Sequence, residues 1–351
     1  MSNKERDFFV PGRLCLFGEH SDWVGGHRRQ NSEISVGQTI VVPTNQGTYA
    51  LAREINEPYL EFDSYPFQQC ARIPLDEEKL LKIAKEGGVF SYVAGVAYEI
   101  ITNYQNEKER GISIKNYKTD LPIKKGLSSS ASVCVLTAKV FNEIFNLKWT
   151  PKRIMEIAYL GEITTSSRCG RMDQVCAYNK PVLMSFDGDR LEIEELKIGG
   201  DFYLLIVDLK SKKDTKRILG DLNKGFPFPT NDEEKRKHEY FNKINTKIIE
   251  KAKEILNGFN PRLLGETMSS AQQYFDEYLA PSCPELTAPR LHQVLNYPEI
   301  HNYIWGGKGV GSGGDGSAQL VCKSEEDRKK TRKMLEEKLG LECFDLDLKK
   351  N

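Results

Sequence analysis

The sequence predicts an α+β protein of two domains. Its 351 residues suit two domains, or one large α/β unit with a split core. In the first half, β-like runs punctuated by Gly and Asn are joined by segments with helix-spaced apolar residues. The composition changes near residues 185–200. We therefore expect one domain over residues 1–190 and a second over residues 191–351.

The elements of the first half follow from local patterns. Strand-like runs are FFVPGRLCLFG, QTIVVPT and TYALAREI. Helices are expected at 90–107 and 129–147, with the loop LPIKKGLSSSAS between them. Thr150 and Pro151 are suited to the N-cap and first turn of a helix that reaches about Glu162.

The second half begins with the strand FYLLIVDL at 202–209. A charged stretch after it, with Pro and Gly, predicts an exposed connection over about 210–235, and a mobile lid is the alternative. Helices are expected at about 233–257 and 266–279. A glycine-rich loop at 306–316 should lead directly into the strand SAQLVCK.

Composition argues against several classes of protein. Fifty basic residues balance fifty acidic ones, which gives no reason to expect nucleic acid or an anionic membrane as partner. No apolar stretch approaches the ~18 residues of a membrane span, and the N-terminus lacks a signal-peptide core, so a cytoplasmic location is the default. The eight cysteines form no CxxC pair and predict reduced, buried thiols.

The most informative segment is Pro122–Ser132, which combines small residues, three consecutive hydroxyls and nearby lysines. Small residues let a backbone approach an anion, and the N–H groups at the start of the following helix point outward. It is not a Walker loop, which ends in Gly-Lys-Ser/Thr. A serine-rich N-cap without any ligand is the alternative. The predicted phosphate-binding residues are Lys125, Gly126, Leu127, Ser128, Ser129, Ser130, Ala131 and Ser132.

Three segments in order resemble one enzyme family. Pro122–Ala131 resembles the central motif of the superfamily named for galactokinase, homoserine kinase, mevalonate kinase and phosphomevalonate kinase, the GHMP kinases. Pro11–Gly26, with Pro-Gly-Arg and Gly-Glu-His-Ser-Asp, resembles the galactokinase signature. Gly306–Gly316 resembles the third, glycine-rich motif. The resemblance spans roughly 300 of the 351 residues.

This resemblance implies a fold, cofactors and a cleft. We expect an N-terminal domain with a left-handed βαβ unit and a ferredoxin-like C-terminal domain. ATP and Mg²⁺ are the implied cofactors, and nucleotide and substrate would bind in the cleft between the domains.

The resemblance also implies the reacting groups. Cys169–Gln174 resembles the galactokinase motif whose Asp faces the reacting hydroxyl, which makes Asp173 the base. Arg13 would keep that carboxylate ionised and stabilise the transferring phosphoryl group. Ser130 and Glu162 would hold the Mg²⁺ ion. The alternatives are a turn-capping Asp, a surface Arg and a solvated Glu.

The substrate is expected to be a small sugar. Glu19, His20 and Asp22 match positions that hold sugar hydroxyls in galactokinases, and carboxylates accept hydrogen bonds from vicinal hydroxyls. Backbone contacts are expected from Gly170, Gly313 and Gly314. The implied product is a sugar 1-phosphate.

Several residues depart from the galactokinase pattern. Trp23 replaces the usual Tyr, and residues 27–31 read His-Arg-Arg-Gln-Asn. Arg168 and Arg171 flank the Asp173 loop, so a uronic acid is an alternative substrate, unless these arginines pair with acidic residues. Asp315 is also unusual and has no predicted role.

Two further classes stay open. A kinase of a non-sugar alcohol belongs to the same superfamily, and a non-catalytic sensor of sugar and ATP has the same motifs in part. The protein is expected to be a monomer or a homodimer.

Overall fold

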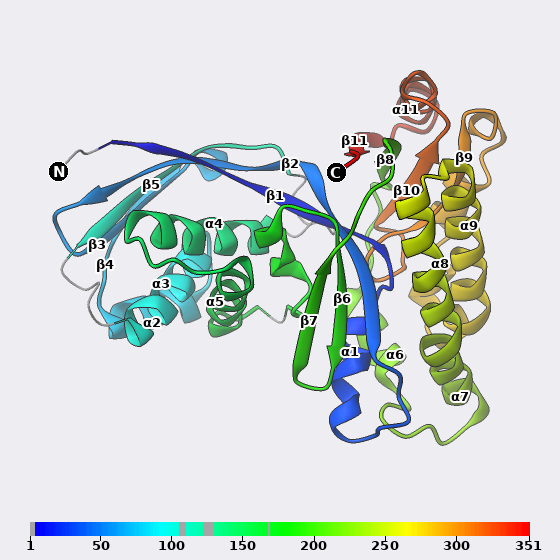
Figure 1. The fold of residues 1–351 in the computed structure, drawn as a ribbon, viewed down its shortest axis with the longest axis horizontal. Coiled ribbons are helices and arrows are strands. Elements are labelled where there is room, and N and C mark those ends of the chain that lie inside the picture. Colours follow the sequence, from blue (N-terminus) through cyan, green and yellow to red (C-terminus); the bar gives the residue numbers. More distant parts are fainter. Residues whose placement is uncertain (1–3, 105–109, 122–128, 168) are drawn as a thin grey trace. The chain divides into compact units, whose positions relative to one another are not determined.

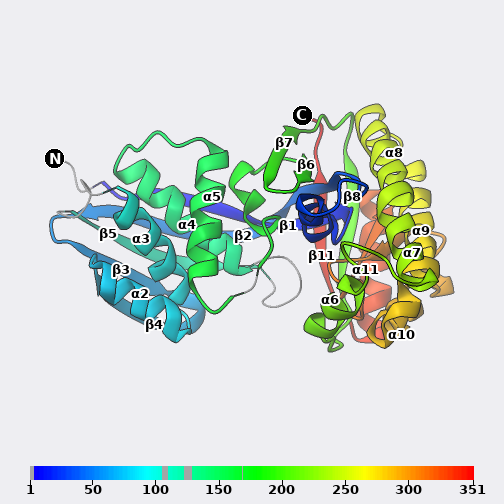
Figure 2. The same cartoon turned by 90° about the horizontal axis from the view of Figure 1, so that it is seen from below.

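The chain forms two units, each of which combines separate stretches of sequence. We describe a computed structural model over residues 4–104, 110–121, 129–167 and 169–351, shown from two directions in Figures 1 and 2. Unit 1 comprises residues 1–13 and 43–179, and unit 2 comprises residues 14–42 and 180–351. The predicted boundary at residue 190 assumed two continuous domains. In the structure, residues 14–42 belong to unit 2, and the chain then returns to unit 1.

Unit 1 contains a sheet in the order β4-β3-β5-β2. The strands are β1 (Arg6–Phe17), β2 (Gly37–Ile55), β3 (Tyr59–Ser64), β4 (Gln69–Pro74) and β5 (Gly111–Thr119). β3 and β5 are parallel, with Leu60 opposite Ile112. β4 pairs antiparallel with β3, and β5 pairs antiparallel with β2. β1 pairs with β2, and both strands continue into the sequence of unit 2. The handedness of the βαβ unit stays a prediction.

Helices cover one face of this sheet (Figures 1 and 2). They are α2 (Glu77–Glu86), α3 (Ser91–Asn103), α4 (Ser129–Ile144) and α5 (Pro151–Thr164), and a 3₁₀ turn follows at Asp173–Tyr178. α5 begins as predicted, because the Thr150 hydroxyl accepts a hydrogen bond from the Arg153 backbone N–H at 3.3 Å.

Two helices of unit 1 cross at very short range. A Cβ atom placed on Gly161 of α5 would lie 2.5 Å from the Cα of Val96 in α3. Only a residue without a side chain permits this approach. The crossing fixes α5, which ends close to Glu162.

Unit 2 begins with a three-strand arrangement. The first part of β2, Gly37–Val41, pairs antiparallel with β6 (Val182–Asp187), which pairs with β7 (Arg190–Glu195). Between β1 and β2 lie α1 (Ser21–Gly26) and a 3₁₀ turn at His27–Arg29.

The second sheet of unit 2 has the order β11-β8-β10-β9, with antiparallel neighbours throughout. Its strands are β8 (Phe202–Asp208), β9 (Ile304–Gly309), β10 (Ser317–Cys322) and β11 (Glu342–Leu348). This order agrees with the implied ferredoxin-like arrangement. One core cluster joins Leu205 and Val207 of β8 to Leu291 of α10 (Pro289–Leu295) and Leu335 of α11 (Glu325–Leu339).

Two expectations for unit 2 were wrong in part. The connection after β8 contains a helix, α6 (Thr215–Asn223), because Asp214 caps it and Ile218 and Leu222 bury one side. Residues 306–309 of the glycine-rich segment belong to strand β9, so the loop covers only 310–316.

The long helical region was predicted closely. It consists of α7 (Asp232–Glu239), a π-helical turn at Tyr240–Ile244 and α8 (Asn245–Gly258). The next helix, α9 (Pro261–Tyr278), begins earlier than expected, capped by Asn260. Further 3₁₀ turns lie at Tyr65–Phe67, Ala280–Ser282, Pro284–Thr287 and Pro298–Ile300.

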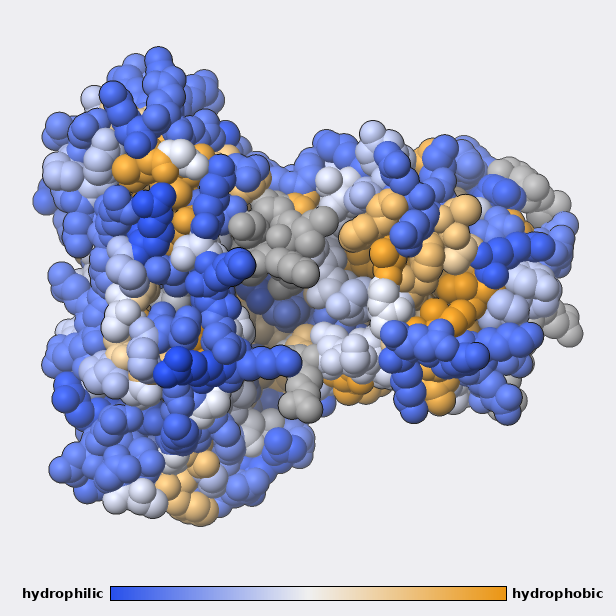
Figure 3. Space-filling model, turned by 180° about the vertical axis from the view of Figure 1, so that it is seen from behind, coloured by the Kyte–Doolittle hydropathy of each residue, from blue (hydrophilic) through white to orange (hydrophobic). Residues whose placement is uncertain are grey.

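One face of the molecule is largely polar. Hydrophilic residues cover most of the face drawn in Figure 3, and hydrophobic residues form separate areas on it.

All eight cysteines are free thiols, and six of them are buried: Cys15, Cys134, Cys176, Cys283, Cys322 and Cys343. Among the helices of the described ranges, none has both the length and the apolar character required to cross a bilayer.

Candidate active site

Unit 1 brings Arg13 and Asp173 into direct contact, although 160 residues separate them. Arg13 lies on β1, and Asp173 opens the 3₁₀ turn that follows α5. Arg13 Nε donates to Asp173 Oδ1 at 3.0 Å, and Nη2 donates to the same oxygen. Both bonds use Oδ1, so neither occupies Oδ2. Arg13 is buried, while Asp173 keeps 23% of its side chain exposed.

A second carboxylate lies close to this pair. Glu162, at the end of α5, is 1% exposed. Gln174 Nε2 donates to its Oε2 at 2.8 Å, and Ser167 Oγ donates to Oε1 at 3.4 Å. Burial raises the pKa of Glu162 and the charge of Asp173 raises it further, while hydrogen bonds from Ser130, Gln174 and Ser167 act in the opposite direction.

The neighbours of Glu162 suit a hard metal ion. The Ser130 hydroxyl and the Glu162 carboxylate are oxygen donors, which Mg²⁺ prefers, and they are hydrogen-bonded to each other. No group of three or more His, Cys, Asp or Glu side chains placed to hold a metal occurs among the residues that the structure covers. A Mg²⁺ ion held by one or two protein oxygens ordinarily keeps waters and binds substrate phosphates.

The predicted phosphate loop is only partly visible. Lys125, Gly126, Leu127 and Ser128 lie outside the described residues. Ser129 and Ser130 form the first turn of α4, whose N-terminal N–H groups favour an anion. The Ser132 hydroxyl instead donates to Thr48 Oγ1 at 2.9 Å and Val10 O at 3.2 Å, inside unit 1. Ala131 is also buried.

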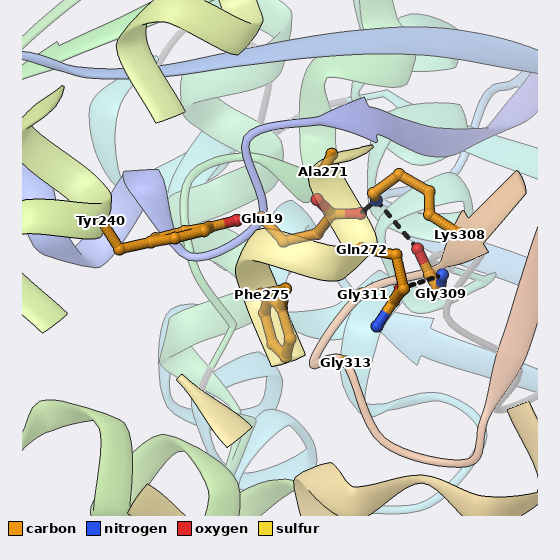
Figure 4. Close-up of a pocket in the computed structure, with 9 residues that line it drawn as sticks. All are labelled: Glu19, Tyr240, Ala271, Gln272, Phe275, Lys308, Gly309, Gly311 and Gly313. Atoms are coloured by element: carbon orange, nitrogen blue, oxygen red, sulfur yellow. Dashed lines mark hydrogen bonds and ion pairs between the residues drawn. The ribbon is translucent and has the colours of Figure 1, made fainter. Parts of the chain in front are cut away.

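Unit 2 contains a pocket built around Glu19 (Figure 4). Glu19 follows β1, and its Oε1 accepts a hydrogen bond from the ammonium of Lys308 on β9. Lys308 Nζ also donates to the Gly309 carbonyl at 2.9 Å. The pocket is lined by Glu19, Tyr240, Ala271, Gln272, Phe275, Lys308, Gly309, Gly311 and Gly313. Glu19 therefore lines this pocket.

His20 has both ring nitrogens engaged. Trp23 Nε1 donates to His20 Nδ1 at 3.1 Å, so the proton is assigned to Nε2, which faces the Ser312 carbonyl at 3.3 Å. Burial lowers the pKa of His20 to about 4, and the charges of Lys213 and Lys308 lower it further. His20 is thus a neutral residue that connects the start of α1 to the loop at 310–316.

The other predicted substrate residues are spread over both units. Asp22 is half-buried in α1, and Gly170 is exposed in the loop before Asp173. Gly313 lines the pocket with φ +89°, and a Cβ there would lie 2.3 Å from the ring of Phe275. Gly314 is buried beside the Glu285 carbonyl and Ile218. Only Glu19 and Gly313 of the predicted set line the described pocket.

Most of the unexpected arginines have partners within their own unit. Arg28 pairs with Asp187, and Arg29 pairs with Asp189 at 3.0 Å. The Arg171 guanidinium lies 5.4 Å from the ring centroid of Tyr159. Arg168 lies outside the described residues. Arg28 and Arg29 therefore pair with aspartates of their own unit.

Asp315 gains a role that the sequence did not suggest. Its Oδ1 accepts a hydrogen bond from the Leu291 backbone N–H at 2.8 Å. Leu291 lies in the first turn of α10, whose own N-cap residue, Ala288, provides no side-chain bond. Asp315 therefore caps α10 from a distant part of the chain.

Two residues of the site were missed from sequence. Gln174, which contacts Glu162, directly follows Asp173 within the matched motif, so the signal was available. Lys308 stands in a glycine-rich segment with no pattern that marks it as a site residue, and its partner Glu19 is 289 positions away.

Comparisons with known proteins agree with the motifs. The family model described as GHMP kinases N terminal domain matches residues 91–180, which contain Ser130, Glu162 and Asp173. The galactokinase of Clostridium acetobutylicum is 30% identical over 212 residues, which cover 60% of this chain and 51% of the relative. The chain spans about half the length of the curated relatives it matches.

Solved structures share the fold over the whole chain. The Methanococcus jannaschii mevalonate kinase has a TM-score of 0.77 at 18% identity, and each chain is covered completely. The Lactococcus lactis galactokinase complexed with galactose has a TM-score of 0.72 at 17% identity, covering 100% of this chain and 95% of that one. Residues 91–180 therefore match the N-terminal domain of the GHMP kinases. About 60% of the chain is similar in sequence to galactokinases, and the whole chain shares the fold of a mevalonate kinase and a galactokinase.

Proposed function

We propose that this chain is an ATP-dependent sugar kinase that phosphorylates the anomeric hydroxyl of a monosaccharide. The contact between Arg13 and Asp173 carries the proposal. A carboxylate can take the proton of a hydroxyl, and a guanidinium beside it can stabilise negative charge. The galactokinase relatives support a sugar as the acceptor.

In the proposed reaction, Asp173 takes a proton from the sugar hydroxyl. The hydroxyl oxygen forms a bond to the γ-phosphorus of ATP, the bond from that phosphorus to the β–γ bridging oxygen breaks, and ADP leaves. Arg13, which pairs with Asp173, stabilises charge on the transferring group. The helix start at Ser129 and Ser130 favours the phosphates through its N–H groups.

Ser130 and Glu162 are the residues proposed to hold Mg²⁺. The ion, when bound, would neutralise charge on the phosphates. Gln174 keeps the Glu162 carboxylate in place through its hydrogen bond.

A uronic acid stays the alternative substrate. It was suggested by Arg168, which lies outside the described residues, and by Arg171, whose guanidinium lies 5.4 Å from the ring centroid of Tyr159. A neutral sugar is proposed because the curated relatives are galactokinases. The predicted cytoplasmic location and the monomeric or homodimeric state stay predictions.

A screen for ADP release tests the function. The panel contains neutral hexoses, pentoses, amino sugars and uronic acids, together with homoserine, mevalonate and a cyclitol, and the Arg13→Gln variant is the matched control. Turnover with a neutral sugar, lost in the control, supports the proposal, and NMR of the product identifies the phosphorylated hydroxyl. Tight ATP binding without turnover on any compound would favour the sensor, and activity confined to a non-sugar alcohol would favour the other kinase class.

A further inference from the structure

Lys308 is a buried cation in the lining of the unit 2 pocket. Its side chain is 8% exposed and that of Glu19 is 11% exposed. Burying an ammonium is unfavourable unless acceptors surround it. Glu19 Oε1 and the Gly309 carbonyl are two such acceptors. The strand β9 is held at this point by a hydrogen bond from the Gly309 N–H to Gln272 Oε1 at 2.8 Å.

Lys308 and Glu19 each keep a hydrogen-bonding position that their ion pair does not use. An ammonium has three N–H groups, and Glu19 and Gly309 provide acceptors for two of them. Within the described ranges, no other acceptor is hydrogen-bonded to Lys308 Nζ, and no donor is bonded to Glu19 Oε2. Both groups line the same pocket, as Figure 4 shows. The pocket wall therefore offers a donor beside an acceptor.

We infer that Lys308 is a substrate-binding and specificity-determining residue, which acts with Glu19 to bind two adjacent oxygens of a neutral sugar. One hydroxyl donates to Glu19 Oε2, and the neighbouring oxygen accepts the third N–H of Lys308. This inference rests on the proposed function, since it takes the pocket of Glu19 as the place where the sugar binds.

The charges of the pocket favour a neutral ligand. Glu19 and Lys308 form an ion pair in the pocket lining, and their opposite charges offset each other. Tyr240 is buried, and burial and the Glu19 charge both raise the pKa of its phenol, so it is neutral. A carboxylate in place of the hydroxyl that donates to Glu19 would face a like charge, and like charges repel. Phe275 and Ala271 provide apolar surface for the C–H groups of a sugar ring.

Paired changes in protein and sugar test the inference. Binding of D-galactose, D-glucose and D-mannose, their monodeoxy analogues and the corresponding uronic acids is measured by calorimetry for wild type, Lys308→Met and Lys308→Arg. For the sugar that binds, removing the oxygen that contacts Lys308 should weaken binding to wild type roughly 10- to 100-fold. Lys308→Met should weaken the parent sugar similarly, yet show no further loss with that deoxy analogue. Lys308→Arg, which keeps charge and donors, should restore most of the affinity.

Three outcomes would overturn the inference. Lys308→Met could bind the parent sugar as tightly as wild type, or it could lose the same factor for the parent and every deoxy analogue. A uronic acid could also bind more tightly than its neutral parent in wild type. Circular dichroism and the affinity for a non-hydrolysable ATP analogue report folding separately, and Lys308→Arg keeps the test valid if the Met variant does not fold.

Calorimetry needs no phosphoryl transfer, so the two proposals can fail independently. Coupling between Lys308 and one hydroxyl without phosphorylation of any sugar would reject the kinase function and support the binding role. Phosphorylation without such coupling would do the reverse.

Discussion

Replacing His20 with Asn should make the protein less sensitive to acidic pH, because it removes a buried group whose protonation favours the unfolded chain. Burial lowers the pKa of His20 from 6.5 to about 4. Between these values the unfolded chain binds the proton and the folded chain does not, so the free energy of unfolding falls as the pH falls. Above pH 6.5 this residue has little effect on stability. Between pH 7.5 and pH 5 we expect its contribution to destabilise the fold by about 2 kcal/mol, and by roughly 3 kcal/mol once the pH is below 4.

Asn suits this position for two reasons. His20 has φ 70°, a left-handed conformation that Asn tolerates. The Asn side-chain oxygen can replace Nδ1 as the acceptor for Trp23, and the amide does not titrate. The matched control is His301→Asn, at an exposed histidine of the same unit.

Urea unfolding at several pH values, followed by circular dichroism, measures the effect. Between pH 7.5 and pH 5, His20→Asn should lose about 2 kcal/mol less stability than wild type, and the control should follow wild type. NMR titration of the histidine ring protons should show a His20 resonance, assigned by its absence in the variant, that does not titrate above pH 5. A midpoint near 6.5, or parallel stability profiles for wild type and His20→Asn, would refute the reasoning.

Three further predictions concern the fold and the metal site. Asp315→Ala should lower stability by about 1 kcal/mol through loss of the α10 cap while Asp315→Asn preserves it, and equal unfolding midpoints for wild type and Asp315→Ala would contradict this. Gly161→Ala should cost about 1–3 kcal/mol, because its Cβ meets Val96, whereas Gly220→Ala in α6, with open space around it, should be neutral or stabilising; thermal unfolding compares them. Gln174→Ala should weaken Mn²⁺ binding, measured by electron paramagnetic resonance in the presence of an ATP analogue, by roughly 10-fold or more. Unchanged Mn²⁺ affinity would exclude a positioning role.

Local sequence patterns predicted the helices that have a clear capping residue or a clear apolar spacing. Thr150 and Pro151 marked the start of α5 correctly, and the apolar spacing identified α3, α4 and the region 232–258. The helix α6 was missed because it is short and mostly polar, and its two buried residues, Ile218 and Leu222, are too few to give a recognisable apolar pattern. The single long strand β2 was read as two shorter runs.

The candidate site was predictable only where a motif carried it. The Met-Asp-Gln segment identified Asp173, and Pro-Gly-Arg identified Arg13, which the structure brings into contact. The pairing of Glu19 with Lys308 and the capping of α10 by Asp315 join segments that are distant in sequence, and no local pattern reports such contacts. The engagement of both His20 nitrogens likewise depends on Ser312, far along the chain.

Turnover by Asp173→Asn tests the central claim most directly. The substitution keeps the size of the side chain and removes the group proposed to accept the proton. With the best sugar of the panel, we expect turnover to fall by roughly 10²- to 10⁴-fold while ATP affinity changes little. Turnover close to that of wild type would contradict the account, because proton transfer to Asp173 would then not be part of the reaction.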